Sequence, residues 1–110
     1  NHLRFENHGE NKKIMMGKIR RVVLDTLKPM EPTIIEMAKM LSIIDGVASV
    51  NISIAEIDLK VENAKITIEG ENINYEKVEE LIQDMGASIH SIDEVVAGKE
   101  IIDDAETLQG

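Results

Sequence analysis

Two segments with the apolar spacing of helices, each lying between strand-like runs, place the strongest constraint on how this chain folds. Residues 33–46 contain a capping box from Thr33 to Glu36, an apolar stripe with helical spacing, and a glycine after the stripe. Residues 74–86 repeat this plan, with Asn74 as the N-cap and another glycine at the end. The sequence therefore predicts two short amphipathic helices.

Four strand-like segments surround these helices. They are rich in β-branched residues or alternate apolar and polar side chains, and Pro29 ends the first of them. The predicted strands are residues 18–28, 47–58, 64–70 and 87–98. The resulting order is βαββαβ, in which each crossover holds a helix and is expected to be right-handed.

This order predicts a ferredoxin-like α+β sandwich, with a four-stranded antiparallel sheet and two helices on one face. The first and third strands are expected to lie at the centre of the sheet and to run parallel to each other. Because the helices cover only one face, the other face is left to water or to a partner.

The chain divides into three expected regions. Residues 1–16 are polar and lack apolar periodicity, so we interpret them as an N-terminal arm or an upstream extension. Residues 17–98 form the ferredoxin-like domain. Residues 99–110 form an acidic tail whose apolar pair, Ile101 and Ile102, is expected to dock on a neighbouring subunit.

Composition and charge argue against several classes of function. With 21 acidic and 12 basic residues, the chain has a formal net charge of −9, which repels phosphate backbones. Aromatic residues, which would stack on bases, make up only 2%. The chain has no cysteine, and it has no apolar run long enough to span a bilayer. We therefore expect no nucleic-acid partner, no membrane partner and a cytoplasmic location.

The segment HSIDEVVAG, residues 90–98, departs from the alternation of a regular strand. Ile89 and Ile92 are three residues apart, so both face the core only if a bulge falls near His90. Without a bulge, Ile92 turns outward and joins Val23 of the neighbouring strand in an apolar stripe on the uncovered face. Such a stripe would be an interface with a second subunit.

The polar residues of the same segment are candidates for contacts. His90 is a candidate pH-sensitive or ligand-contacting group, although a lone histidine on a strand is more often structural and hydrogen-bonded. Asp93 and Glu94 point to opposite faces of a regular strand. Either carboxylate is expected to pair with Arg20 or Arg21 on the adjacent strand.

A divalent-cation site is another interpretation of the acidic residues. Glu56, Asp58 and Glu62 surround the hairpin between the second and third strands. We expect the topology to place them at the same end of the sheet as Asp93 and Glu94. Convergent carboxylates suit a hard cation such as Ca²⁺ or Mg²⁺. The sequence has no EF-hand loop pattern, so solvated acids at strand ends are the alternative.

Four stretches of the chain resemble a known family. The runs IRRVVLDTLKP, VNISIAEID, ENAKITIEG and HSIDEVVAGKEI are similar, in this order, to the short archaeal proteins called domain of unknown function 211. The resemblance covers most of residues 18–107. It implies a ferredoxin-like fold, an archaeal cytoplasmic origin and homo-oligomers, and it implies no catalytic residues.

These observations favour a non-catalytic homo-oligomeric assembly or small-ligand-sensing module. The alternative is a protein that binds calcium or magnesium through the carboxylates named above. An enzyme is least favoured, because the sequence has no cysteine nucleophile, no G-x-S-x-G motif and no phosphate-binding glycine loop. The expected partners are a second copy of the chain and a small ligand or divalent cation.

Overall fold

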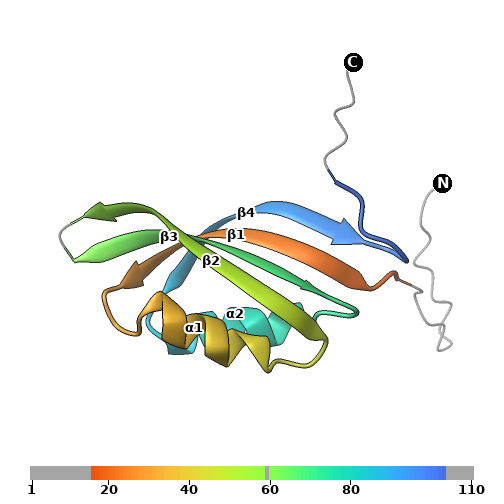
Figure 1. Ribbon diagram of the computed structural model, residues 1–110, viewed down its shortest axis with the longest axis horizontal. Helices are drawn as coiled ribbons and strands as arrows, with labels where there is room; N and C mark the ends of the chain where they lie inside the picture. Colours follow the sequence, from red (N-terminus) through yellow and green to blue (C-terminus); the bar gives the residue numbers. More distant parts are fainter. Residues whose placement is uncertain (1–15, 59, 104–110) are drawn as a thin grey trace, which may run out of the picture.

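The computed structural model describes residues 16–58 and 60–103 and confirms the predicted order of elements (Figure 1). The elements are β1 (Ile19–Pro29), α1 (Ile34–Ser42), β2 (Val47–Asp58), β3 (Val61–Gly70), α2 (Tyr75–Asp84) and β4 (Ser88–Ala97). They form one sheet in the order β2-β3-β1-β4 with both helices on one face, which is the predicted ferredoxin-like fold. Residues 1–15 and 104–110 lie outside the described residues, and with them most of the predicted arm and tail.

Every strand pair in the sheet is antiparallel, which corrects the prediction that the first and third strands run parallel. The crossover through α1 returns the chain so that β2 runs in the direction of β1. The hairpin then reverses the chain, so β3 meets β1 antiparallel, with Arg21 opposite Glu69 and Pro29 opposite Val61. The hairpin is also tighter than predicted, because β3 begins at Val61.

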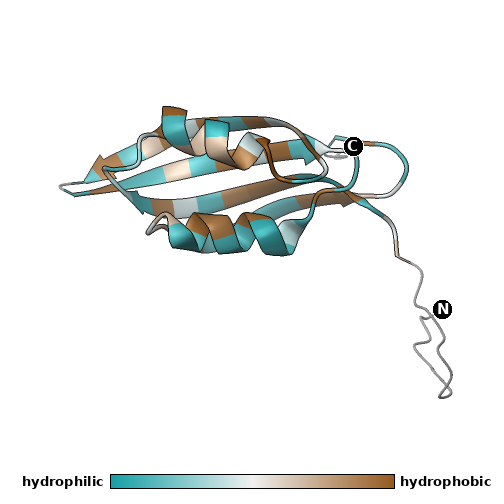
Figure 2. Cartoon of the chain, turned by 90° about the horizontal axis from the view of Figure 1, so that it is seen from below, coloured by the Kyte–Doolittle hydropathy of each residue, from teal (hydrophilic) through white to brown (hydrophobic). Residues whose placement is uncertain are grey.

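Both helices begin with the predicted caps. The Thr33 hydroxyl accepts a hydrogen bond from the Glu36 backbone N–H at 3.2 Å, and the Glu36 carboxylate accepts one from the Thr33 N–H at 3.0 Å. The Asn74 side chain accepts a hydrogen bond from the Lys77 N–H at 3.3 Å. The two helices lie across the same side of the sheet (Figure 2). Neither, in the part of the chain described, is long and apolar enough to cross a membrane.

The hydrophobic core lies between the helices and the sheet. The two central strands contribute alternate residues to it, as expected for strands with one covered face. The most buried members are Val22 and Leu24 of β1, Ile66 and Ile68 of β3, Met37 and Leu41 of α1, and Val78 and Ile82 of α2. This layer fixes which residues of each strand face the helices and which face the open side.

The loop that follows α1 contacts the loop that follows β3 through backbone hydrogen bonds. The Glu71 N–H donates a hydrogen bond to the Gly46 carbonyl at 3.0 Å, and the Asn74 N–H donates one to the Asp45 carbonyl at 3.4 Å. Gly46 has a φ of 86°, and a Cβ at this position would lie 1.9 Å from the carbonyl oxygen of Asn72. Only glycine allows both this backbone conformation and this approach.

Candidate functional site

The sheet face that the helices leave open is mainly polar. Directly opposite residues of an antiparallel pair share a face. Three such pairs of β2 and β3 lie on the open face: Ser49 with Glu69, Asn51 with Thr67, and Ser53 with Lys65. Val23 of β1 also lies on this face but is only 7% exposed, while Leu27 and Val61, which are more exposed, lie near the hairpin end.

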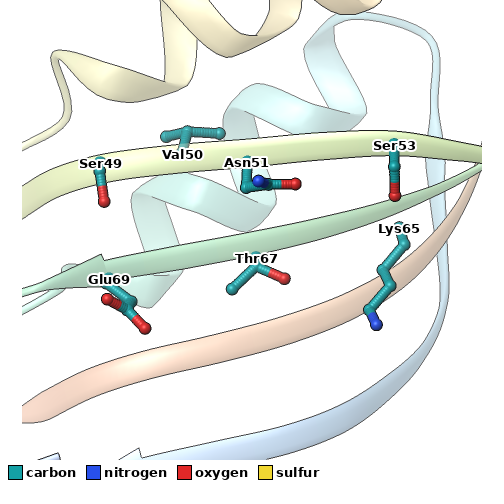
Figure 3. Close-up of a pocket in the computed structure, with 7 residues that line it drawn as sticks. All are labelled: Ser49, Val50, Asn51, Ser53, Lys65, Thr67 and Glu69. Atoms are coloured by element: carbon teal, nitrogen blue, oxygen red, sulfur yellow. The ribbon is translucent and has the colours of Figure 1, made fainter.

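The side chains of β2 and β3 line a shallow groove of ≈490 Å³ on the open face (Figure 3). Its lining residues are Ser49, Val50, Asn51, Ser53, Lys65, Thr67 and Glu69. Among the polar members, only Glu69 has a side-chain hydrogen bond or ion pair with another described residue. The Lys65 ammonium group is therefore free to meet a ligand.

Arg21 joins three carboxylates at one side of this groove. Its Nε lies 2.6 Å from the Glu69 carboxylate, and its Nη1 lies 3.2 Å from both the Glu94 and the Asp103 carboxylates. The hydrogen bond to Glu69 is the main cause that raises the pKa of Arg21 above its ordinary value, so the guanidinium stays charged. The predicted pairing of Glu94 with an arginine of the adjacent strand is confirmed.

Arg20 holds the start of the segment that follows β4. Its Nε donates a hydrogen bond to the Gly70 carbonyl at 3.0 Å, and its Nη1 donates to the carbonyls of Gly98, at 3.2 Å, and Lys99. One arginine therefore connects the end of β3 to the chain beyond β4. Its Nη2 also lies 3.8 Å from the Glu71 carboxylate, in the loop that follows β3.

The two isoleucines of the tail differ in how far they are exposed. Ile101 is partly buried, whereas Ile102 is 64% exposed. The ion pair between Asp103 and Arg21 holds this part of the tail against its own chain. Docking of the two isoleucines on a neighbouring subunit stays a prediction, and Ile102 is the more accessible of the two.

The five carboxylates predicted to share one end of the sheet do not converge. β4 starts at the hairpin end, where Ser88 lies opposite Leu27, and runs away from it, so Glu94 lies opposite Val23. Asp93 and Glu94 are therefore separated along the sheet from the acids of the hairpin, Glu56, Asp58 and Glu62. Over residues 16–58 and 60–103, no group of three or more Asp, Glu or His side chains is placed to hold a metal ion.

Glu62 of this set has a structural partner. The Lys28 ammonium, on a side chain that is 0% exposed, lies 2.9 Å from the Glu62 carboxylate. It also donates hydrogen bonds to the carbonyls of Pro29, at 2.6 Å, and Met30, at 3.4 Å. All three ammonium protons have acceptors, as a buried lysine requires. The pair stabilises the end of β1.

Two irregularities in β4 decide where its apolar side chains point. The register against β1 shifts at His90 and again at Asp93, so each is an extra, bulged residue. The bulge near His90 is one of the two predicted alternatives. It places Ile89 opposite Thr26 and Ile92 opposite Leu24, on the helix side. The predicted stripe of Ile92 and Val23 on the open face therefore does not form.

His90 itself lies at the first bulge with an exposed side chain. That side chain makes no hydrogen bond or ion pair with a residue of the described chain. Because β4 is the edge strand beyond β1, His90 lies apart from the groove formed by β2 and β3. A pH-sensitive or ligand-contacting role for His90 stays a prediction.

Exposed apolar side chains lie at the two opposite edges of the sheet, in addition to those near the hairpin end, which are Leu27, Met30, Ile57 and Val61. At the β4 edge, Ile92 is 51% and Val95 54% exposed. At the β2 edge, the outer surface of α1 and its C-cap exposes Ile35 by 67% and Ile43 by 83%. The α1 side chains lie outside the stripe predicted to be buried. Their apolar character was therefore a sequence signal for this surface.

Comparison with known proteins gives a consistent result. The profile of the domain of unknown function 211 family, described as "Uncharacterized ArCR", matches residues 20–110. An uncharacterised protein of the archaeon Methanocaldococcus jannaschii is 51% identical over 94 residues, which are 86% of this chain and 97% of that protein. Neither description states an activity or a ligand.

Proposed function

Because this chain belongs to the domain of unknown function 211 family, for which no activity is described, we propose a function from its surfaces: a non-catalytic, self-assembling module of the cytoplasm. The observation that carries this proposal is the pair of apolar patches at opposite edges of the sheet. We define the β4 patch as Ile92 and Val95, and the α1 patch as Ile35 and Ile43.

The exposure of these patches supports an interface. All four side chains are more than half exposed in the single chain. Isolated exposed apolar residues are ordinary, but grouped ones beside a free strand edge are a common sign of association. β2 and β4 both have one edge that pairs with no described strand. A second copy of the chain would cover the apolar side chains and the unpaired backbone groups together.

The first test is the mass of the full chain in solution. We expect sedimentation equilibrium or light scattering to give a multiple of the 12.3 kDa monomer at micromolar concentration. Truncation after Gly98 should lower this mass, because it removes the exposed Ile102. A monomer at high concentration would contradict the proposal. An unchanged mass after truncation would contradict only the role of the tail.

Small-ligand sensing at the open-face groove is a second candidate function. The groove presents hydroxyl, amide and ammonium groups without side-chain partners among the described residues, while Arg21 neutralises Glu69. Lys65 is therefore its free charge. This chemistry fits a small hydroxy acid, whose carboxylate would meet Lys65 and whose hydroxyls would meet Ser53 and Asn51.

This candidate is tested with glycerate as the probe and glycerol as its uncharged analogue. We expect glycerate, and not glycerol, to shift the amide NMR signals of β2 and β3. The Lys65→Gln variant should bind glycerate at least tenfold more weakly. The control variant Lys77→Gln, which changes a lysine ion-paired with Glu80 on α2, should keep the original affinity. Equal responses to both probes, or an unchanged Lys65→Gln variant, would rule the groove out as an anion site.

A further inference from the structure

We infer that copies of this chain join head to tail, with the β4 edge of one copy against the β2 edge of the next. In this arrangement Ile92 and Val95 of one copy enter a groove between α1 and β2 of its neighbour. The inference rests on the proposed self-assembly and goes further, because it assigns the two surfaces that meet and the direction in which the strands run.

Strand direction is the first argument. β2 pairs antiparallel with β3, β3 with β1, and β1 with β4, so the two edge strands run antiparallel to each other. When a second copy is added in the same orientation, its β4 is therefore antiparallel to the β2 that it meets. The sheet continues across the contact with the same alternation of strand direction.

The groove at the β2 edge is the second argument. It has a volume of ≈320 Å³ and is lined by Ile34, Ile35, Ala38, Val50, Asn51 and Ile52. Val50 and Ile52 pack against the core, so the groove lies on the helix side of the sheet. It is predominantly apolar and opens along the edge at which an added strand would sit.

The β4 patch projects on this same side. Ile92 lies opposite Leu24 and Val95 opposite Val22, and both partners belong to the core beneath the helices. Even so, α2 leaves Ile92 and Val95 about half exposed. A strand that continues the neighbour's sheet would place these two side chains on the helix side, next to Val50 and Ile52, which line the groove. The direction in which Ile92 and Val95 point therefore agrees with the position of the groove, and neither chain has to change its conformation.

Bulges limit the pairing to one stretch of each edge. In β2 the register against β3 shifts on either side of residues 49–54, and in β4 the last regular stretch against β1 is 94–96. A bulge interrupts regular pairing and so protects an edge. Val50 and Ile52 of the groove lie in the first stretch, and Val95 lies in the second. The regular backbone thus selects the contact made by Val95, and Ile92 lies just before the bulge at Asp93.

Charge favours this pairing over one symmetric alternative, and the filling of the groove favours it over the other. Lys39 lies on α1 and Asp93 on β4, and neither makes an ion pair with another described residue. The Asp93 carboxylate accepts a hydrogen bond from the Ser91 hydroxyl at 2.7 Å but has no cation beside it, so head-to-tail contact brings it to the edge that carries Lys39. A β4-to-β4 contact would bring the Asp93 carboxylates of two copies to the same interface, and like charges across strands are unfavourable. A β2-to-β2 contact would leave each groove without a side chain to fill it.

Cysteine cross-linking tests the geometry, since the chain has no cysteine of its own. We compare Val95→Cys, Ile35→Cys and the double variant, each in the full chain and treated with a short bis-maleimide. We expect no covalent dimer from either single variant alone, a dimer when the two are co-expressed, and a ladder of multimers from the double variant. Both positions are exposed in the single chain, so the substitutions should preserve the fold.

Other cross-linking results have separate meanings. Dimers from Val95→Cys alone would indicate β4-to-β4 contact, and dimers from Ile35→Cys alone would indicate contact between two α1 surfaces; either overturns the head-to-tail inference. An oligomer that gives no cross-link also overturns it but leaves the proposed self-assembly intact. A monomeric mass without cross-linker would contradict both the head-to-tail inference and the proposed self-assembly.

A substitution gives an independent measure. Val95→Asp would place an unpaired carboxylate in the apolar groove, so we expect the association constant to fall at least about 100-fold. The matched control is Met30→Asp, which puts the same charge on an exposed apolar position outside both patches and should leave the constant unchanged. Circular dichroism should be identical for both variants. Equal effects of the two substitutions would contradict the assigned contact.

Discussion

Gly46→Ala should destabilise the fold by at least about 3 kcal/mol, which is large for the addition of one methyl group. The φ of 86° at this position costs a non-glycine residue about 1–2 kcal/mol. The new Cβ would also lie 1.9 Å from the Asn72 carbonyl oxygen, so the loop after β3 must move away. Urea unfolding followed by circular dichroism measures the loss.

Gly86→Ala is the matched control for this substitution. Gly86 has the same φ of 86°, but the nearest atom to an added Cβ is a side-chain carbon of Pro29 at 3.6 Å. We expect the free energy of unfolding of this variant to fall by only about 1–2 kcal/mol, which is the cost of a positive φ for a non-glycine residue. The difference between the two variants isolates the cost of separating the two loops. Equal losses would mean that the contact between the loops contributes nothing to stability.

Lys28→Met should destabilise the protein by about 3–5 kcal/mol, although it keeps an unbranched side chain of similar length. The substitution leaves the Glu62 carboxylate without its cation and the carbonyls of Pro29 and Met30 without their donor. An uncompensated charge in a nearly closed site is the expected cause of the loss. Thermal and urea unfolding of the variant provide the measurement.

Two further variants separate charge from packing at this site. The double variant Lys28→Met/Glu62→Met removes both charges and should recover part of the loss. Lys77→Met breaks an ion pair whose side chains are 63% and 62% exposed, so it should change stability by no more than about 0.5 kcal/mol. If Lys28→Met changed stability as little as Lys77→Met, burial would not increase the contribution of the Lys28 ion pair to stability.

The fold could be predicted because local signals and topology agree. The capping box at Thr33 and the N-cap at Asn74 set the helix starts, and both are found. Two topological predictions were wrong: parallel central strands, and hairpin acids at the same end of the sheet as Asp93 and Glu94. Both depend on how the chain runs through each strand, which the pattern of apolar residues does not show.

The candidate site was less predictable, because its contacts join residues far apart in the chain. Arg21 meets carboxylates that are 48, 73 and 82 residues away, and only the strand order brings them together. The surface patches depend on how far each helix covers the sheet. Helical spacing identifies the stripe on α1 that is buried, but it does not show that α2 leaves Ile92 and Val95 uncovered.

The two extra residues in β4 affect how related sequences should be compared. Counting by two along a strand normally tells which positions share an environment, but here the count restarts at His90 and at Asp93. Positions 89, 92 and 95 are therefore equivalent despite their spacing. A relative that lacks one of these extra residues would pair regularly at that point and keep the following side chains on the same faces, so a single-residue gap in an alignment would mark the loss of a bulge with the outer surface preserved.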